Sequence, residues 1–148
     1  MDFGILLGLA YQHFVLELNR HLAERGFASI GPSYGYVFRA LGAERRTTAQ
    51  LAAQLGITSQ GMAKIVEDME ATGYVERHAD PADARLKLLD LTPRGRAALA
   101  AARKFHHDFE ARLSSLVGPR KVSTTREVLT ALVGAAPADD LTRTLRPF

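Results

Sequence analysis

The sequence predicts a mainly α-helical fold with one small two-stranded β-wing. Apolar residues recur at helical spacing through most of the chain, from Phe3 to Val133. Residues 47–73 hold two short helical patterns joined at a glycine, and residues 74–91 hold two strand-like runs around a proline-containing turn. Two such helices followed by a hairpin are typical of a winged helix-turn-helix lobe. We expect that lobe together with a helical dimerisation region.

The composition narrows the class of protein. The chain has 148 residues, a formal net charge of +3 and no cysteine. The length suits one domain with helical extensions, and the mild positive charge is compatible with a nucleic-acid partner. The lack of cysteine excludes disulfides, Cys-type zinc sites and thiol redox chemistry. The apolar opening FGILLGLA is too short to cross a bilayer and lacks a basic leader, so we expect a cytoplasmic protein without membrane association.

Residues 1–30 form the first predicted unit, an N-terminal dimerisation helix that runs from Phe3 to about Arg25 and ends at Gly26. One apolar stripe consists of Leu7, Tyr11, Phe14, Leu18 and Leu22, and a second consists of Ile5, Leu9, Leu16 and Ala23. A helix that is apolar on two sides must bury both of them. In a chain of this size, we expect the second side to meet another copy of the chain.

Residues 31–95 form the second predicted unit, the winged lobe. A helix from Pro32 or Ser33 to Leu41 precedes a polar break over residues 42–46. The two helices of the motif have caps at Thr47 or Thr48 and at Thr58 or Ser59, a turn at Gly56 and an end at Gly73. Their expected core residues are Leu51, Ala52 and Leu55, then Met62, Ile65, Val66 and Met69. Strands over residues 74–77 and 86–91 flank a turn at residues 80–83.

Residues 96–148 form the third predicted unit, the C-terminal dimerisation helices and tail. A long helix opens at Thr92-Pro93 and continues to about Val117, where Gly118-Pro119 breaks it. Its heptad-like seam contains Leu99, Ala102, Phe105 or His106, Phe109, Leu113 and Leu116. Residues 124–127 resemble a capping box before a last helix, which ends at Pro137 and leaves a polar tail. A symmetric dimer would present two reading heads to one DNA duplex.

The central stretch also resembles a known family. It reads LAAQLGITSQGMAKIVEDMEATGYVER followed by DPADARLKLLDLTPRG, and it is similar to the MarR family of bacterial transcription regulators. Asp83-Ala84-Arg85, Leu91-Thr92 and Gly95 match the wing signature of that family. The resemblance implies a homodimer with paired terminal helices. It also implies a repressor, less often an activator, commonly released from DNA by a small aromatic or lipophilic ligand.

The expected DNA-binding residues lie on the second helix of the motif and on the wing. They are Thr58, Ser59, Gln60, Gly61 and Lys64 on the helix, and Arg77, Asp83, Arg85 and Lys87 on the wing. Gln60 suits adenine and Lys64 suits guanine or phosphate, while the helix start suits a phosphate. Arg85 is the candidate for the minor groove, with Asp83 orienting it. The alternative for the helix residues is that they form an ordinary solvated polar face. The alternative for Asp83 and Arg85 is a surface pair that only stabilises the turn.

The same helix carries an acidic run, Glu67, Asp68 and Glu70, in its second half. Carboxylates repel phosphate, so we confine the expected DNA contacts to the first two turns. The acidic run also supports a rival function, a winged-helix protein-interaction module without DNA binding. Arg94 and Arg96 lie at a helix start, where they oppose the helix dipole, which suggests that an anionic group lies near them.

Aromatic and histidine residues outside the motif suggest further sites. Candidates for lining an effector pocket are Tyr11, His13, Phe14, Tyr34, Tyr36 and Phe38, although aromatics at helical spacing are more often core. His13, Glu17 and His21 share helical spacing, which could place metal ligands on one helix face, and His106 and His107 lie on a later helix. An exposed polar stripe explains this spacing equally well. We expect no metal, no cofactor and no catalytic residues, because no nucleophile, phosphate loop or acid–base pair is recognisable. The expected partners are double-stranded DNA, a second copy of the chain and a small-molecule effector.

Overall fold

The computed structural model describes residues 1–31 and 33–134 of the chain. Within them, the elements in order are α1 (Phe3–Ala23), α2 (Tyr34–Ala43), α3 (Thr48–Leu55), α4 (Ser59–Ala71), β1 (Val75–Ala79), β2 (Lys87–Leu91), α5 (Pro93–Val117) and α6 (Pro119–Val133). The two strands pair in an antiparallel sheet. The mainly helical fold with a two-stranded wing is therefore confirmed.

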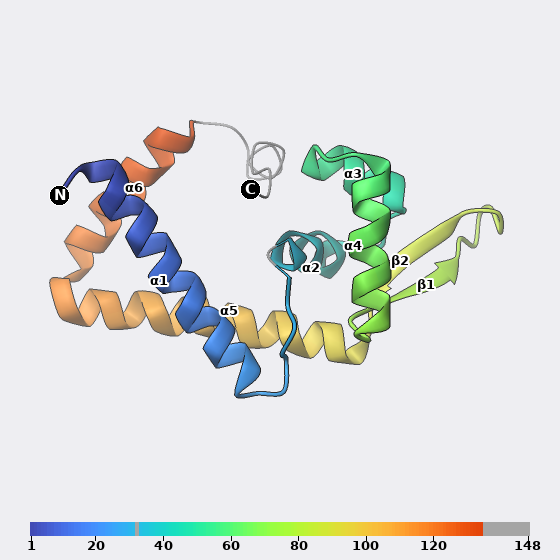
Figure 1. Ribbon diagram of the computed structural model, residues 1–148, viewed down its shortest axis with the longest axis horizontal. Coiled ribbons are helices and arrows are strands. Elements are labelled where there is room, and N and C mark those ends of the chain that lie inside the picture. Colours follow the sequence, from blue (N-terminus) through green and yellow to red (C-terminus); the bar gives the residue numbers. More distant parts are fainter. Residues whose placement is uncertain (32, 135–148) are drawn as a thin grey trace.

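Helix α5 connects the two ends of the molecule (Figure 1). Helix α2 and strand β2 contact α5, and α3 and α4 complete the lobe by packing on α2, on each other and on β1. Helix α1 crosses α5, and α6 folds back against α5 at the opposite end from the wing. The two segments expected to mediate dimerisation thus lie together in space, away from the winged lobe.

The hydrophobic core lies in the winged lobe. Its most completely buried side chains come from α2, α3, α4, β2 and the residue before β1, and are Val37, Leu41, Leu51, Met62, Val66, Met69, Tyr74, Leu89 and Leu91. All members of the predicted core faces of α3 and α4 are buried here except Ile65, which packs against the core while partly exposed. These apolar faces orient α4, because burying one side of the helix turns the other side outward.

Local hydrogen bonds define the ends of the two motif helices. Thr47 and Gln50 form a capping box at the start of α3, and Gly56 adopts a left-handed φ of 65° in the turn. The Thr58 hydroxyl caps α4 by accepting from the Gly61 amide at 3.0 Å. Gly73, with φ +77°, follows the end of α4 and leads the chain into the wing.

The wing is anchored to the lobe by a contact that the sequence did not predict. Arg46 forms a β-bridge with Leu89, with backbone hydrogen bonds of 3.3 and 2.7 Å in the two directions. The segment before α3 therefore lies against β2 as a one-residue third strand. A single bridge needs only one residue in extended conformation, so it leaves no alternating sequence pattern.

Several predicted helix boundaries were wrong. Helix α6 begins at Pro119 rather than near Thr124, because Pro119 suits the first position of a helix and Gly118, with φ +93°, breaks α5. Residues 124–127 lie inside α6, where the Thr125 hydroxyl donates to the Lys121 carbonyl. Helix α2 continues through the expected break to Ala43. The predictions about Pro32, Pro137 and the tail lie outside the described residues.

Candidate nucleic-acid interface

The first turns of α4 expose the polar residues expected to contact DNA. Thr58, Ser59, Gln60 and Lys64 are exposed, whereas Met62 and Val66 on the opposite side are fully buried. Gly61 is half-buried, and a Cβ atom there would lie 3.1 Å from the Thr58 hydroxyl oxygen. Gly61 is thus explained by the helix cap as well as by the predicted approach of DNA. The free amides of this first turn give the helix start a positive end.

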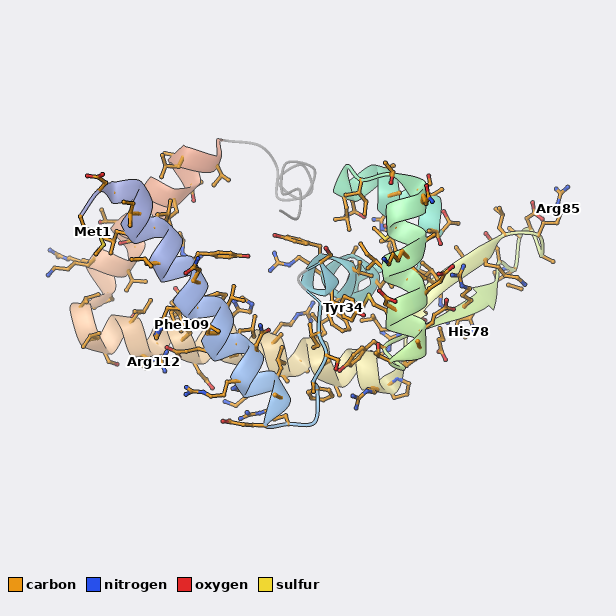
Figure 2. The ribbon with its side chains drawn as sticks, in the orientation of Figure 1. Met1, Tyr34, His78, Arg85, Phe109 and Arg112 are labelled. Carbon is orange, nitrogen blue, oxygen red and sulfur yellow. The ribbon has the colours of Figure 1, made fainter. Side chains whose placement is uncertain are left out.

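The wing tip holds an oriented arginine. Arg85 Nε donates to Asp83 Oδ1 at 3.1 Å and Arg85 Nη2 donates to Oδ2 at 3.2 Å, which makes a two-point pair. The side chain of Arg85 is 90% exposed and projects from the end of the hairpin (Figure 2). The Arg85 guanidinium and backbone amide hold the pKa of Asp83 below its ordinary value. Lys87 is exposed at the start of β2.

The other wing arginine, Arg77, contacts α4. Its Nε donates to both carboxylate oxygens of Glu70, at 2.8 and 3.0 Å. This hydrogen bond, together with the negative charges of Glu70 and Glu67, raises the pKa of Arg77. The acidic second half of α4 is therefore partly compensated by the wing, a pairing that linear spacing did not reveal.

A buried carboxylate, also missed by sequence reasoning, lies at the base of the wing. Asp90 is only 6% exposed; it accepts from Arg45 Nε at 2.8 Å and from Arg96. Burial alone would raise the pKa of Asp90, but hydrogen bonds from Arg45 and the Leu91 amide and the charge of Arg96 hold it below its ordinary value. Asp90 is the anionic group that the position of Arg96 suggested, and it joins the segment before α3 to β2 and α5.

Arg94 instead contacts aromatic and backbone groups. Its guanidinium carbon lies 4.8 Å from the ring centre of Tyr74 and 5.6 Å from that of Phe27, and its Nη2 donates to the Gly26 carbonyl at 2.9 Å. The Tyr74 hydroxyl in turn donates to the Ala28 carbonyl. These contacts join the α1–α2 connection to the lobe. Arg94 therefore contacts aromatic rings and a backbone carbonyl at this helix start, in place of the expected anionic group.

The six aromatic and histidine residues expected to line an effector pocket separate into three environments. Tyr34 and Phe38 lie in the lobe core beside Tyr74. Phe14 packs against Phe105 and Phe109, so it belongs to the α1–α5 contact. Tyr36 is partly buried, and Tyr11 and His13 are exposed.

The surroundings of Tyr36 shift the pKa values of two side chains. Burial raises the pKa of Tyr36, and Tyr11 adds to the effect while Arg39 opposes it. Burial also lowers the pKa of His106, with Arg39 contributing. The charge of Arg39 on α2 thus acts on both Tyr36 of α2 and His106 of α5, and Tyr11 of α1 acts on Tyr36.

A separate cavity of about 310 Å³ lies between α1 and α5, and none of the six predicted pocket residues lines it. Its walls are Glu17, Arg20, His21, Glu24, Phe105, Asp108, Phe109 and Arg112. His13 Nε2 lies 2.6 Å from a carboxylate oxygen of Glu17, and Arg112 pairs with the same carboxylate. Among residues 1–31 and 33–134, no three His, Asp or Glu side chains are placed to hold a metal ion.

The helix-turn-helix, the exposed start of α4 and the hairpin together define a winged helix-turn-helix protein. No helix within the described part of the chain is long and apolar enough to span a membrane. The sequence profile of the MarR family matches residues 29–86. Over these residues the chain is similar to the MarR family, and its fold is that of solved members of that family of transcription regulators.

Similar proteins are found among both sequences and solved structures. An uncharacterized protein of Mycobacterium tuberculosis, Rv2011c, is 31% identical over 93 residues, which are 63% of this chain and 65% of that relative. The transcriptional repressor CouR, solved bound to a 23-mer DNA duplex, is 26% identical with a TM-score of 0.70, covering 90% of this chain and 93% of CouR. A mutant of MepR from S. aureus bound to an oligodeoxyribonucleotide has a TM-score of 0.62 at 18% identity, covering 90% and 96% of the two chains.

Proposed function

We propose that this protein is a sequence-specific DNA-binding transcription regulator. The observation that carries the proposal is the joint exposure of the α4 start and of Arg85, which lie on the two elements that a winged helix presents to a duplex. The likeness to CouR, a repressor solved on DNA, supports it. In this proposal Gln60 and Lys64 contact base edges in the major groove, and Thr58, Ser59 and Gly61 approach the phosphate backbone.

The wing supplies the second set of contacts. Arg85 enters the minor groove next to the half-site, where narrow A·T tracts concentrate negative potential. Asp83 orients the guanidinium but leaves Nη1 without a hydrogen-bond partner among the described residues. Lys87 and Arg77 contact phosphates.

We propose that the protein acts as a homodimer. Large apolar side chains are exposed on α1 and α6, at the end of the molecule opposite the wing (Figure 1). They are Phe3, Ile5, Leu6, Leu7, Leu9 and Leu16 on α1, and Val128, Leu129, Leu132 and Val133 on α6. An apolar surface of this extent is unstable in water, and a second copy would cover it. Two lobes would then read a pseudo-palindromic operator with half-sites about one helical turn apart.

As a repressor, the dimer would block transcription by occupying its operator. A small aromatic or lipophilic effector is proposed to bind near Tyr11 of α1 and Tyr36 of α2, whose helices both pack against α5. Binding that favours a lobe spacing unsuited to the operator would weaken DNA affinity, and a coupling of about 1–3 kcal/mol corresponds to about five- to 150-fold. Substituting Tyr36 by alanine would then reduce the response to the effector.

The DNA assignment is tested by selecting duplexes from a random pool and measuring affinity by mobility shift. Arg85→Ala should weaken binding to the selected duplex about 10- to 100-fold, while the protein remains dimeric. Arg120→Ala removes the same charge from an exposed position on α6 and is the matched control. Equal affinities for Arg85→Ala and the control would remove the wing from the interface. If the wild-type protein selects no duplex at low salt, the protein-interaction module becomes the better reading.

A further inference from the structure

The ion pair between Glu70 and Arg77 joins the helix and the strand that the proposed function uses. Glu70 lies in the last turns of α4 and Arg77 in the middle of β1, two elements that pack directly together (Figure 1). Arg77 Nε donates to both oxygens of the Glu70 carboxylate, at 2.8 and 3.0 Å. The two side chains are 30% and 36% exposed, so the pair is half-buried at the edge of the interface.

Core packing fixes the backbone on both sides of this pair. Glu70 follows Val66 by four residues, so both lie on the same side of α4, and Val66 is fully buried. Arg77 follows Val75 by two residues and pairs across the sheet with Leu89, both of which are buried. The stem of Arg77 therefore leaves the sheet on the face that packs against α4. Neither side chain depends on a loop for its position.

The hydrogen bonds of Arg77 involve only one of its three side-chain nitrogens. Within the described residues, Nε alone is engaged, and the Nη1 and Nη2 atoms have no hydrogen-bond partner. A guanidinium held at Nε has a fixed plane, so the direction of its remaining N–H groups is also fixed. Those groups suit an oxyanion such as a phosphate.

We propose that Glu70 is a positioning residue for DNA binding, which holds Arg77 so that its terminal nitrogens are oriented toward a backbone phosphate. The inference rests on the proposed DNA-binding function. Glu70 has two opposing effects: its charge repels the phosphate, while its hydrogen bond orders Arg77 before DNA arrives and so lowers the entropy cost of binding. In this proposal the ordering outweighs the repulsion.

Glu67 provides a matched control. It lies three residues before Glu70 on α4 and is exposed; its charge acts on Arg77, but it makes no hydrogen bond with it. Removing Glu67 therefore removes a repulsive charge without releasing Arg77. We expect Glu67→Ala to bind DNA equally or more tightly than wild type, and Glu70→Ala to bind about two- to fivefold more weakly, the scale of a partly exposed ion pair.

The experiment is a double-mutant cycle with the duplex that the wild-type protein selects from a random pool, measured by fluorescence anisotropy. In the Arg77→Gln background, Glu70→Ala should leave affinity unchanged or increase it, because only the repulsion is left. Arg77→Gln alone should make the slope of log affinity against log salt shallower by about 1.8, the loss of one phosphate contact in each of the two lobes. Thermal melting checks that each variant is folded.

Three results would overturn the inference while leaving the proposed function intact. The first is tighter binding by Glu70→Ala, which would make Glu70 only a repulsive charge. The second is the same weakening by Glu70→Ala with and without Arg77, which would make its role structural. The third is an unchanged salt slope for Arg77→Gln. Failure of the wild-type protein to bind any duplex would instead overturn both the inference and the DNA-binding function.

Discussion

Gly95 at the start of α5 offers a sharp test of how the wing is attached. A Cβ atom at this position would lie 2.1 Å from the Tyr74 carbonyl oxygen and 3.3 Å from Leu91 Cβ. The first distance is about 0.9 Å shorter than the 3.0 Å that real Cβ contacts respect. Because the obstacle is backbone, Gly95→Ala must move β1 and α5 apart rather than rotate a side chain.

The hydrogen bonds at this junction set the size of the effect. The Tyr74 carbonyl accepts from the Thr92 amide at 3.1 Å, and the Thr92 hydroxyl donates to the Gly73 carbonyl at 2.6 Å. Moving the Tyr74 backbone away from α5 strains both hydrogen bonds, each of which is worth about 1 kcal/mol. The added methyl group in this tightly packed junction costs about another 1–3 kcal/mol. The better helix propensity of alanine offsets about 1 kcal/mol. We expect Gly95→Ala to lower the free energy of unfolding by about 2–4 kcal/mol.

Chemical denaturation of the folded protein at fixed protein concentration measures this value. Gly35→Ala is the matched control: Gly35 lies in α2 with an ordinary φ, and no atom lies within 4 Å of an added Cβ. It should be neutral or stabilising by up to about 1 kcal/mol. If Gly95→Ala and Gly35→Ala unfold within about 0.5 kcal/mol of each other, the reasoning about the wing junction is refuted.

Two further predictions concern the dimer and the buried carboxylate. Leu16→Glu, at a side chain 69% exposed on α1, should convert the dimer into monomers in sedimentation analysis and weaken operator binding; a dimer of unchanged affinity would remove α1 from the interface. Asp90→Asn should destabilise the lobe by about 1–3 kcal/mol at pH 7, because Arg45 and Arg96 lose their shared anion. Since the folded state lowers the pKa of Asp90, its contribution is present above the ordinary aspartate pKa of about 3.9 and is lost as pH falls through the folded value. The free energies of unfolding of wild type and Asp90→Asn should differ by a constant amount above about pH 4 and converge as pH falls below it, whereas an offset that stays constant throughout the acid range would contradict this account.

The parts of the fold that the sequence predicted are those with local periodicity. Met62, Val66 and Met69 recur at helical spacing because one face of α4 is buried, and Gly56 marks a turn that needs a left-handed residue. The start of α6 was misplaced because residues 124–127 carry capping-box chemistry, while the proline at 119 already suits a helix start. Both Pro119 and residues 124–127 suit a helix start, and the helix begins at Pro119, directly after the break at Gly118.

The parts of the candidate site that were missed depend on contacts between distant residues. Arg45 and Asp90 are 45 positions apart in the chain, so no motif links them. Glu70 and Arg77 are only seven apart, but a helix end and a turn separate them, and neither a helical nor a strand period brings them together. Within the aromatic set, Tyr34 and Phe38 fill the lobe core, the alternative that is more common for aromatics at helical spacing.

The salt dependence of DNA affinity tests the central claim most directly. With the duplex selected from a random pool, the wild-type protein should bind with two chains per site, and log affinity should fall linearly with log salt concentration. A dimer that neutralises about six to ten phosphates should lose about 10³- to 10⁵-fold in affinity between 50 and 200 mM salt. Affinity that does not change with salt, or no binding even at low salt, would contradict the assignment of this chain as a DNA-binding regulator.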